Sequence, residues 1–162
     1  MTDHHQALLR HFADLRDGNH GGAATTRRAK EELFAATVDL LDPVARRVLA
    51  DLDARMLLGR GSVTATGLIG TEDGGKQALW ALSWPEQARA RVAPVVIRAH
   101  YGAGFHHPHL SGGTVGEWPL NVFSAADAEA EEATMRAIVS ADLHNLVFQA
   151  DFRIVPATTA GR

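Results

Sequence analysis

The sequence contains no cysteine. This absence excludes disulfide bonds, thiolate nucleophiles and cysteine metal ligands. Any metal site in the chain must therefore be built from the remaining strong donors, which are histidine and the carboxylates. Nine histidines are present in 162 residues, so we searched their positions for a site.

The sequence also lacks an excess of one charge and any long apolar run. Its formal net charge is −3, whereas a nucleic-acid-binding surface is basic, so we expect no nucleic-acid partner. The basic cluster at Arg27, Arg28 and Lys30 is followed at once by two glutamates and is typical of a solvated helix start. No segment has the length of a membrane span or the apolar core of a secretory signal. We therefore expect a cytoplasmic protein without a membrane partner.

Length and composition indicate one folded domain. Hydrophobic residues make up 46% and charged residues 22% of the chain, which is usual for a globular protein. A chain of this length buries about two thirds of its unfolded surface. We expect residues 1–162 to form a single domain, with a helical part over residues 3–58 and a sheet part over residues 61–156.

The helical part is predicted to begin with a helix over residues 3–17. Leu8, Phe12 and Leu15 recur at helical spacing and predict its apolar face. On this register His11 is expected to be exposed.

A glycine-rich loop that contains His20 follows, and then a second helix is predicted over residues 26–41. The Asp42-Pro43 pair predicts a new start, because Asp is a favoured N-cap and Pro a favoured first helical residue. We therefore expect a third helix that ends near Gly59.

After the helices the hydrophobic pattern changes to that of strands. Residues 62–69 and 76–84 predict a β-hairpin, and residues 95–101 form the most apolar strand. A helix is predicted near residues 124–146 and a last strand over residues 147–155. The fold class expected is α+β, with N-terminal helices followed by a mainly antiparallel sheet of about five strands. We expect this sheet to be curved or to form a partly closed barrel, with one inserted helix.

Residues 100–118, the histidine loop, have a chemical character of their own, with four of the nine histidines and five of the fifteen glycines. His107 and His109 flank Pro108. Proline favours extended geometry in the residue before it, and in an extended chain residues two apart point to the same side. We therefore predict that these two imidazoles point to one target and that His106 faces the other way.

Two histidines and one carboxylate recur in open metal sites. Glu117 is the nearest candidate carboxylate, and His100 or His144 could instead complete a set of three histidines. The cofactor expected is a divalent metal, with iron favoured over zinc. A second reading needs no metal: a histidine such as His106 could act as general acid or base, because imidazole titrates near neutrality.

Arg98 and four aromatic residues are candidates for binding a small-molecule substrate. Arg98 shares one face of its strand with His100, and its forked donors suit a carboxylate; alternatively, that face is solvated. The aromatic candidates for the substrate pocket are Trp80, Trp84, Tyr101 and Trp118. Trp80 and Trp84 could equally pack against the helices.

These features favour a small metal-dependent enzyme that acts on a small organic molecule. A non-haem iron oxidoreductase is favoured over a zinc hydrolase or lyase, because two histidines and a carboxylate suit iron. The alternative is a non-catalytic module or accessory subunit that uses the same loop to bind haem or an apolar ligand. A homo-oligomer is compatible with both hypotheses.

Overall fold

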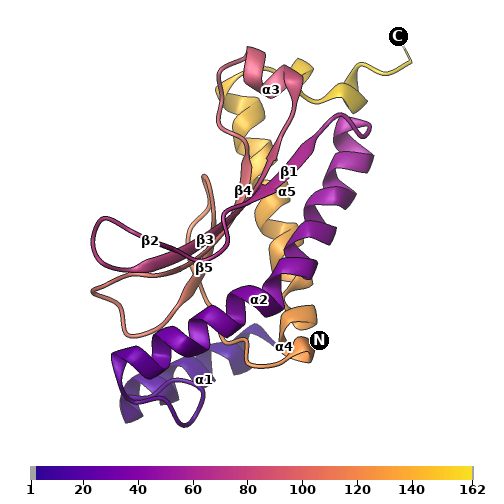
Figure 1. Cartoon of the computed structure of the whole chain (residues 1–162). Coiled ribbons are helices and arrows are strands. Elements are labelled where there is room, and N and C mark those ends of the chain that lie inside the picture. The colour runs from indigo at the N-terminus through magenta and orange to yellow at the C-terminus, as the bar shows by residue number, and fades with distance from the viewer. Residues whose placement is uncertain (1–2, 162) are drawn as a thin grey trace.

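The computed structural model describes residues 3–161 (Figure 1). Its helices are α1 (His4–Asp17), α2 (Arg27–Leu52), α3 (Pro85–Arg89), α4 (Ala125–Ala130) and α5 (Glu132–Gln149). Its strands are β1 (Ser62–Ala65), β2 (Ile69–Gly70), β3 (Lys76–Ser83), β4 (Val95–Tyr101), β5 (His109–Gly112) and β6 (Trp118–Pro119). Among the helices of the described residues, none combines the length and the hydropathy that a transmembrane span requires.

The strands form one antiparallel sheet in the order β1-β3-β4-β5-β6, with β2 paired to the other end of β3. The sheet is open and does not close into a barrel. The predicted α+β class is thus confirmed, and the sheet takes the open form. The predicted strands 76–84 and 95–101 correspond to β3 and β4.

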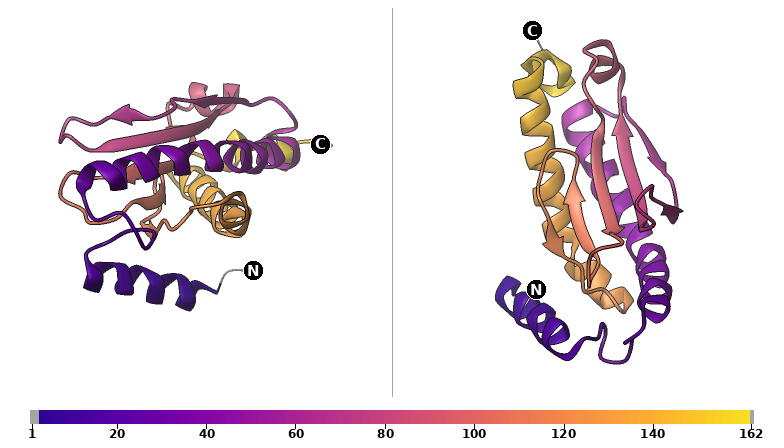
Figure 2. Two further views of the ribbon diagram at one scale, coloured as in Figure 1. Left: turned by 60° about the horizontal axis from the view of Figure 1, so that its bottom comes forward. Right: turned by 90° about the vertical axis from the view of Figure 1, so that its left-hand side faces the viewer.

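Helices α2 and α5 form a layer that covers one face of the sheet (Figure 2). The strand residues that face this layer alternate along the sequence, as expected for a half-buried sheet. On β3 and β4 these buried residues are Ala78, Trp80, Leu82, Val95, Ile97 and Ala99. The opposite face of β4 carries Arg98 and His100. The two-residue alternation that directs apolar side chains into the core therefore also places these polar side chains together.

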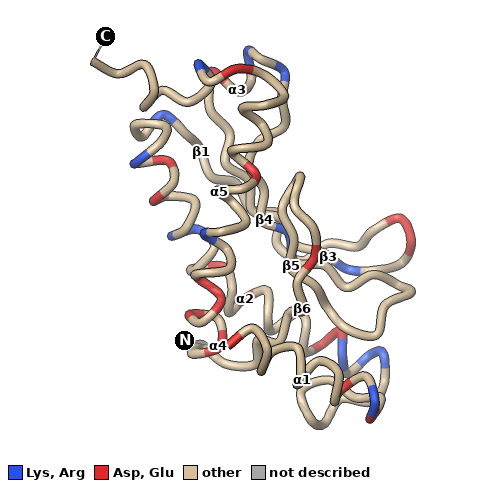
Figure 3. The backbone as a smooth tube through the Cα atoms, turned by 180° about the vertical axis from the view of Figure 1, so that it is seen from behind, with Lys and Arg blue, Asp and Glu red and all other residues tan. Residues whose placement is uncertain are grey.

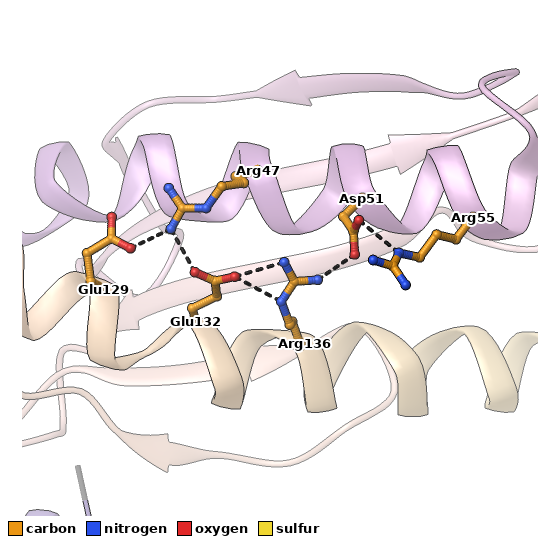
Figure 4. A network of polar contacts seen from close by, with 6 residues as sticks. All are labelled: Arg47, Asp51, Arg55, Glu129, Glu132 and Arg136. Atoms are coloured by element: carbon orange, nitrogen blue, oxygen red, sulfur yellow. Dashed lines mark hydrogen bonds and ion pairs between the residues drawn. The ribbon is translucent and has the colours of Figure 1, made fainter. Parts of the chain in front are cut away.

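On the outer side of the helix layer, six charged side chains connect α2 to α4 and α5: Arg47, Asp51, Arg55, Glu129, Glu132 and Arg136 (Figure 4). Arg47 lies 2.6 Å from Glu129 and 2.8 Å from Glu132. Basic and acidic segments also alternate along α2 in the backbone view (Figure 3). The arginines of α2 are therefore largely balanced by neighbouring carboxylates.

The predicted helix start at Asp42-Pro43 is wrong, because α2 is a single helix of 26 residues that contains Pro43. Asp42 does not cap a helix; its carboxylate accepts hydrogen bonds from Trp80 Nε1 at 2.8 Å and from Arg46. Proline inside a helix removes one backbone hydrogen bond and bends the axis. The axis of α2 changes direction near its middle in Figure 1, which keeps both halves against the sheet.

The predicted last strand over residues 147–155 is also wrong. Helix α5 extends to Gln149, and two short 3₁₀ turns follow at Phe152–Ile154 and Pro156–Thr158. The apolar stripe of α5 continues to Leu146, so helical packing overrides the alternation that suggested a strand. Phe148 and Phe152 are exposed.

Helix α1 lies outside the helix layer, against β6 (Figure 2). Its predicted apolar face is not the buried one: Leu8, Phe12 and Leu15 are 37%, 55% and 43% exposed. The residues of α1 that are buried are His11 and Asp14. The expectation that His11 is exposed is therefore wrong, because the helix turns its polar side toward the histidine loop.

Candidate metal centres

Five histidine rings from distant parts of the chain form a row in the order His20, His107, His11, His109, His100. The distances between successive ring centroids are 5.4, 4.6, 5.9 and 5.8 Å. Each end of the row includes a carboxylate, Glu117 or Asp14, so the row contains two groups with the composition of a metal site.

The first group, the open triad, consists of His100, His109 and Glu117. The register of β4 and β5 places His100 directly opposite His109, and their rings stack. Glu117 Oε1 lies 2.9 Å from His100 Nε2. One ligand atom from each of the three residues lies within 4.8 Å of the other two, a spacing that allows all three to bind one ion.

A buried carboxylate on α5 fixes the turn that brings Glu117 back to the sheet. Asp142 is fully buried and accepts hydrogen bonds from the backbone N–H of Val96 and from the N–H and hydroxyl of Thr114. A Cβ at Gly113 would lie 3.3 Å from this carboxylate, so glycine permits the close approach. The chain between β5 and β6 is thereby anchored beside the open triad.

Arg27 holds the start of the histidine loop. Its guanidinium lies 3.6 Å above the centre of the Tyr101 ring and donates hydrogen bonds to the carbonyls of Tyr101, Gly102 and Phe105. Its Nε pairs with Glu31 at 2.9 Å. Arg27 therefore connects α2 to the loop. The prediction that its side chain is solvated at the start of a helix is wrong.

The second group, the enclosed triad, consists of Asp14, His20 and His107. Their relative exposures are 9%, 1% and 2%, and His20 Nδ1 lies 3.8 Å from Asp14 Oδ2. As in the open triad, three ligand atoms lie within 4.8 Å of one another. These residues come from α1, from the loop after it, and from the histidine loop.

Backbone hydrogen bonds fix the side chains of the enclosed triad. His20 forms an isolated bridge with Ala24, in which each N–H donates to the other residue's carbonyl. The Asn19 N–H donates to the carbonyl of Asp14, while the Asn19 carbonyl pairs with His107 Nε2 at 3.1 Å. A carbonyl only accepts, so Nε2 of His107 carries the proton and Nδ1 offers a lone pair.

Six buried polar atoms of the row and its carboxylates lack a hydrogen-bond partner among the described residues. They are Nδ1 of His11, His20, His100, His107 and His109, and Oδ2 of Asp14. Buried polar groups in folded proteins are nearly always paired. Bound cations would supply the missing partners of these imidazole nitrogens and of the carboxylate oxygen.

Burial lowers the pKa of all five histidines in the row. The effect is largest for His20, where burial and the neighbouring His107 and Lys30 lower the pKa to about 4. The row is therefore neutral near pH 7, and neutral imidazole is the form that binds metal ions.

Two members of the open triad, His100 and Glu117, line a groove of about 620 Å³, and His109 lies outside its lining. Nine further residues line the groove, among them Lys76 and Arg98. Arg98 Nε donates to Ser111 Oγ at 3.3 Å across β4 and β5. Glu117 also borders a smaller cleft of about 280 Å³ that contains Trp118 and Glu131. Neither cleft is lined by a residue of the enclosed triad.

The predicted ligands are divided between the two triads. His107 and His109 both lie against His11, while His106 is exposed, so the alternation about Pro108 agrees with the structure. However, His107 and His109 belong to different triads, and the predicted common target is not found. The cause is the His11 ring, which α1 places between them.

Three other predicted site residues lie elsewhere. His144 is exposed on α5 beside Asn145 and belongs to neither triad. Trp80 and Trp84 are core residues whose indole N–H groups donate to Asp42 and to the Ile154 carbonyl.

The remaining aromatic candidates also differ in position. Tyr101 is 1% exposed and packs under Arg27 in the core, so it lines no cleft. Trp118 borders the smaller cleft next to Glu117. Of the four aromatic candidates, Trp118 alone lines either of the two clefts described above.

Sequence reasoning missed His11, Asp14 and His20. His11 and Asp14 are three residues apart and so share one face of α1, which is the signal that could have revealed them. The apolar stripe on the adjoining side of the same helix obscured it. Comparison with known proteins finds no match for this chain among family models, curated proteins or solved structures.

Proposed function

We propose that this protein is a metal-dependent enzyme that acts on a small organic molecule, and that the open triad holds its catalytic divalent metal. The observation that carries the proposal is that ligand atoms of His100, His109 and Glu117 lie within 4.8 Å of one another and that two of these residues, His100 and Glu117, line a groove. Two imidazoles and one carboxylate with positions left open are typical of non-haem iron oxidoreductases. Iron is therefore favoured, and zinc in a hydrolase or lyase is the other form of the proposal.

The exposure of the triad supports a catalytic rather than a structural ion. The Glu117 side chain is 40% exposed, whereas that of His100 is 10% exposed. The ion would thus be held from the sheet side and reached from the groove. An ion in this position binds water or substrate at its open side and polarises it.

Arg98 is the residue that would orient the substrate. It lines the same groove as His100 and Glu117, and Ser111 holds its Nε. The terminal guanidinium nitrogens, which have no partner among the described residues, suit a bidentate contact with a carboxylate. Lys76 adds a second cation to the groove, whose lining also includes three carboxylates. We therefore expect a substrate with a carboxylate that binds at Arg98.

Metal binding by protein expressed without a histidine tag tests the proposal. The apoprotein is titrated anaerobically with Fe(II), and bound metal is measured by elemental analysis for the parent and for His100→Ala and His109→Ala. We expect each variant to bind one equivalent less, or at least tenfold more weakly. His144→Ala, which removes an exposed histidine outside both triads, is the matched control and is expected to bind as the parent does.

Two results would overturn the proposal. One is equal iron binding by the parent, both triad variants and the control. The other is a Soret absorption band in the purified protein that disappears in the triad variants, because this band would identify the ligand as haem.

A further inference from the structure

Helix α1 is attached to the rest of the molecule in an unusual way. Its exposed residues include Leu8, Leu9, Phe12 and Leu15. Its buried residues are His11 and Asp14. Burial of apolar side chains is the usual force that docks an amphipathic helix, but the apolar side chains of α1 stay largely exposed. Its attachment therefore calls for an interaction made by the polar face.

We propose that the enclosed triad is a second, structural metal site, specific for a zinc-like divalent cation, that fastens α1 to the histidine loop. It is distinct from the open triad and does not depend on the function proposed for that group. The ion would be held by Asp14 Oδ2, His20 Nδ1 and His107 Nδ1.

The atoms that carry this inference are buried and unpaired. Asp14 Oδ2, His20 Nδ1 and His107 Nδ1 each lack a partner among the described residues. One ligand atom from each of these three residues lies within 4.8 Å of the other two, and Asp14 Oδ2 is 3.8 Å from His20 Nδ1. Leaving one such group unsatisfied costs on the order of 1–3 kcal/mol. A single cation at their centre would satisfy all three.

The tautomer of His107 is already the one that a metal ligand needs. Its Nε2 donates to the carbonyl of Asn19, as the second nitrogen of a ligating histidine usually does to a carbonyl or carboxylate. Asn19 lies between the other two ligands in the sequence, because it follows Asp14 and directly precedes His20. The same short segment therefore supplies two ligands and orients the third.

The enclosure of the triad indicates a structural ion. None of its residues lines either cleft, so no open position faces a substrate. Structural zinc sites are closed and usually have four ligands. His11, whose Nδ1 is also buried and unpaired, has its ring 4.6 Å from that of His107; it lies outside the group of three and is the nearest further histidine for a fourth position.

The donor set agrees with a divalent cation at this position. Asp14 contributes the negative charge, and its carboxylate is 3.8 Å from His20. Lys30, which is buried beside His20, favours the neutral form of that ring, while its own positive charge opposes a cation there. The site therefore presents one carboxylate and neutral imidazoles, a donor set that suits zinc.

Zinc binding and the order of α1 should then be coupled, because the ligands come together only in the folded state. The parent apoprotein is titrated with Zn(II) by calorimetry, and amide hydrogen exchange of residues 4–17 is measured with and without the ion. We expect two equivalents of zinc per chain and exchange in α1 that is at least tenfold slower with zinc.

Variants separate the two sites. His20→Ala and Asp14→Asn should lose one equivalent and the zinc-dependent protection of α1. His100→Ala/His109→Ala should lose the other equivalent and keep the protection. His5→Ala, which removes an exposed histidine from α1 itself, is the matched control and should behave as the parent.

The proposal is overturned if zinc leaves the exchange of α1 in the parent unchanged, a result that requires no variant to fold. It is equally overturned if His20→Ala, or the more conservative His20→Gln, is folded by circular dichroism and binds as much zinc as the parent. A parent that binds one equivalent, lost in His20→Gln and kept in His100→Ala/His109→Ala, would support the enclosed site and count against the open one.

Discussion

At the scale of the residue, single buried polar atoms determine what the candidate site can do. The hydrogen bond from His107 Nε2 to the Asn19 carbonyl leaves one defined lone pair on that ring. The contact of His100 Nε2 with Glu117 defines another on the opposite end of the row. Because these partners place the protons of the two rings on Nε2, their buried Nδ1 atoms are free to accept before any ligand binds.

Asp142 is the buried residue on which the geometry of the open triad most depends. In Asp142→Ala, the N–H groups of Val96 and Thr114 lose their acceptor. We expect the free energy of unfolding to fall by about 3 kcal/mol, since hydrogen bonds to a charged group are stronger than neutral ones. Urea denaturation measures the change.

The matched control is Asp39→Ala, which removes an exposed aspartate from α2 and should change stability by no more than about 0.5 kcal/mol. Equal effects of the two substitutions would contradict the anchoring role of Asp142. Asp142→Asn, which keeps one acceptor oxygen, should fall between them.

Glu131, which follows α4 and lines the smaller cleft, makes stability depend on pH. Burial raises the pKa of its carboxyl from 4.5 to about 7. The folded protein therefore keeps this proton up to about pH 7, whereas the unfolded chain releases it near pH 4.5. The unfolded state binds fewer protons between these values, so this group makes stability fall as pH rises through that window.

In Glu131→Gln this contribution is absent. We expect the variant to match the parent at pH 4.5 and to be more stable than the parent at pH 8, as measured by urea midpoints at the two pH values. Glu72→Gln, at an exposed turn position, serves as control and should show no such divergence. A stability difference that is the same at both pH values would rule out the titration of Glu131 as its cause.

At the scale of the element, the histidine loop is held by contacts from both helices of the layer. Asp142 of α5 fixes the end of β5, and Arg27 at the start of α2 fixes the chain after β4. The loop is thus restrained at both sides of the segment that carries His107 and His109. Contacts of this kind commonly tune a metal site from outside its ligand shell.

Replacement of Arg27 by lysine should loosen the loop. Lysine cannot reproduce the planar contact with Tyr101 or donate to three carbonyls at once. In Arg27→Lys we expect faster amide exchange of residues 102–106 and about tenfold weaker binding of Fe(II) at the open triad. Mass spectrometry and anaerobic titration measure the two effects.

Arg28→Lys is the control for this substitution, because Arg28 is exposed and pairs with Glu32 on the same helix. It should alter neither quantity. If exchange in the loop is the same in both variants, Arg27 does not restrain the loop.

Elements with a strong period could be predicted from the sequence, and elements decided by tertiary context could not. β3 and β4 alternate over most of their length and pack on the helix layer as expected. Pro43 and Asp42 form a good helix start locally, but packing against Trp80 overrides it. In α1 the apolar period is real, yet periodicity does not say which side of a short helix faces the protein.

At the scale of the whole molecule, the candidate site combines residues from distant parts of the chain. His100, His109 and Glu117 were within reach of sequence reasoning, because they belong to one loop and its flanking strands. Their meeting depends on the β4–β5 register, which no local pattern specifies. His11 and His20 reach the row only through the docking of α1 and its loop, so nothing local in the sequence reveals their role.

Helix α1 supplies candidate metal ligands but no residue of the apolar core. The apolar core cluster begins at Phe34 and includes no residue of α1, while α1 contributes His11 and Asp14. A chain shortened to begin after Gly18 would keep every member of that cluster and yet lack two donors next to His107. The apolar core cluster therefore contains no part of the N-terminal helix, whereas the donor set at one end of the histidine row depends on that helix.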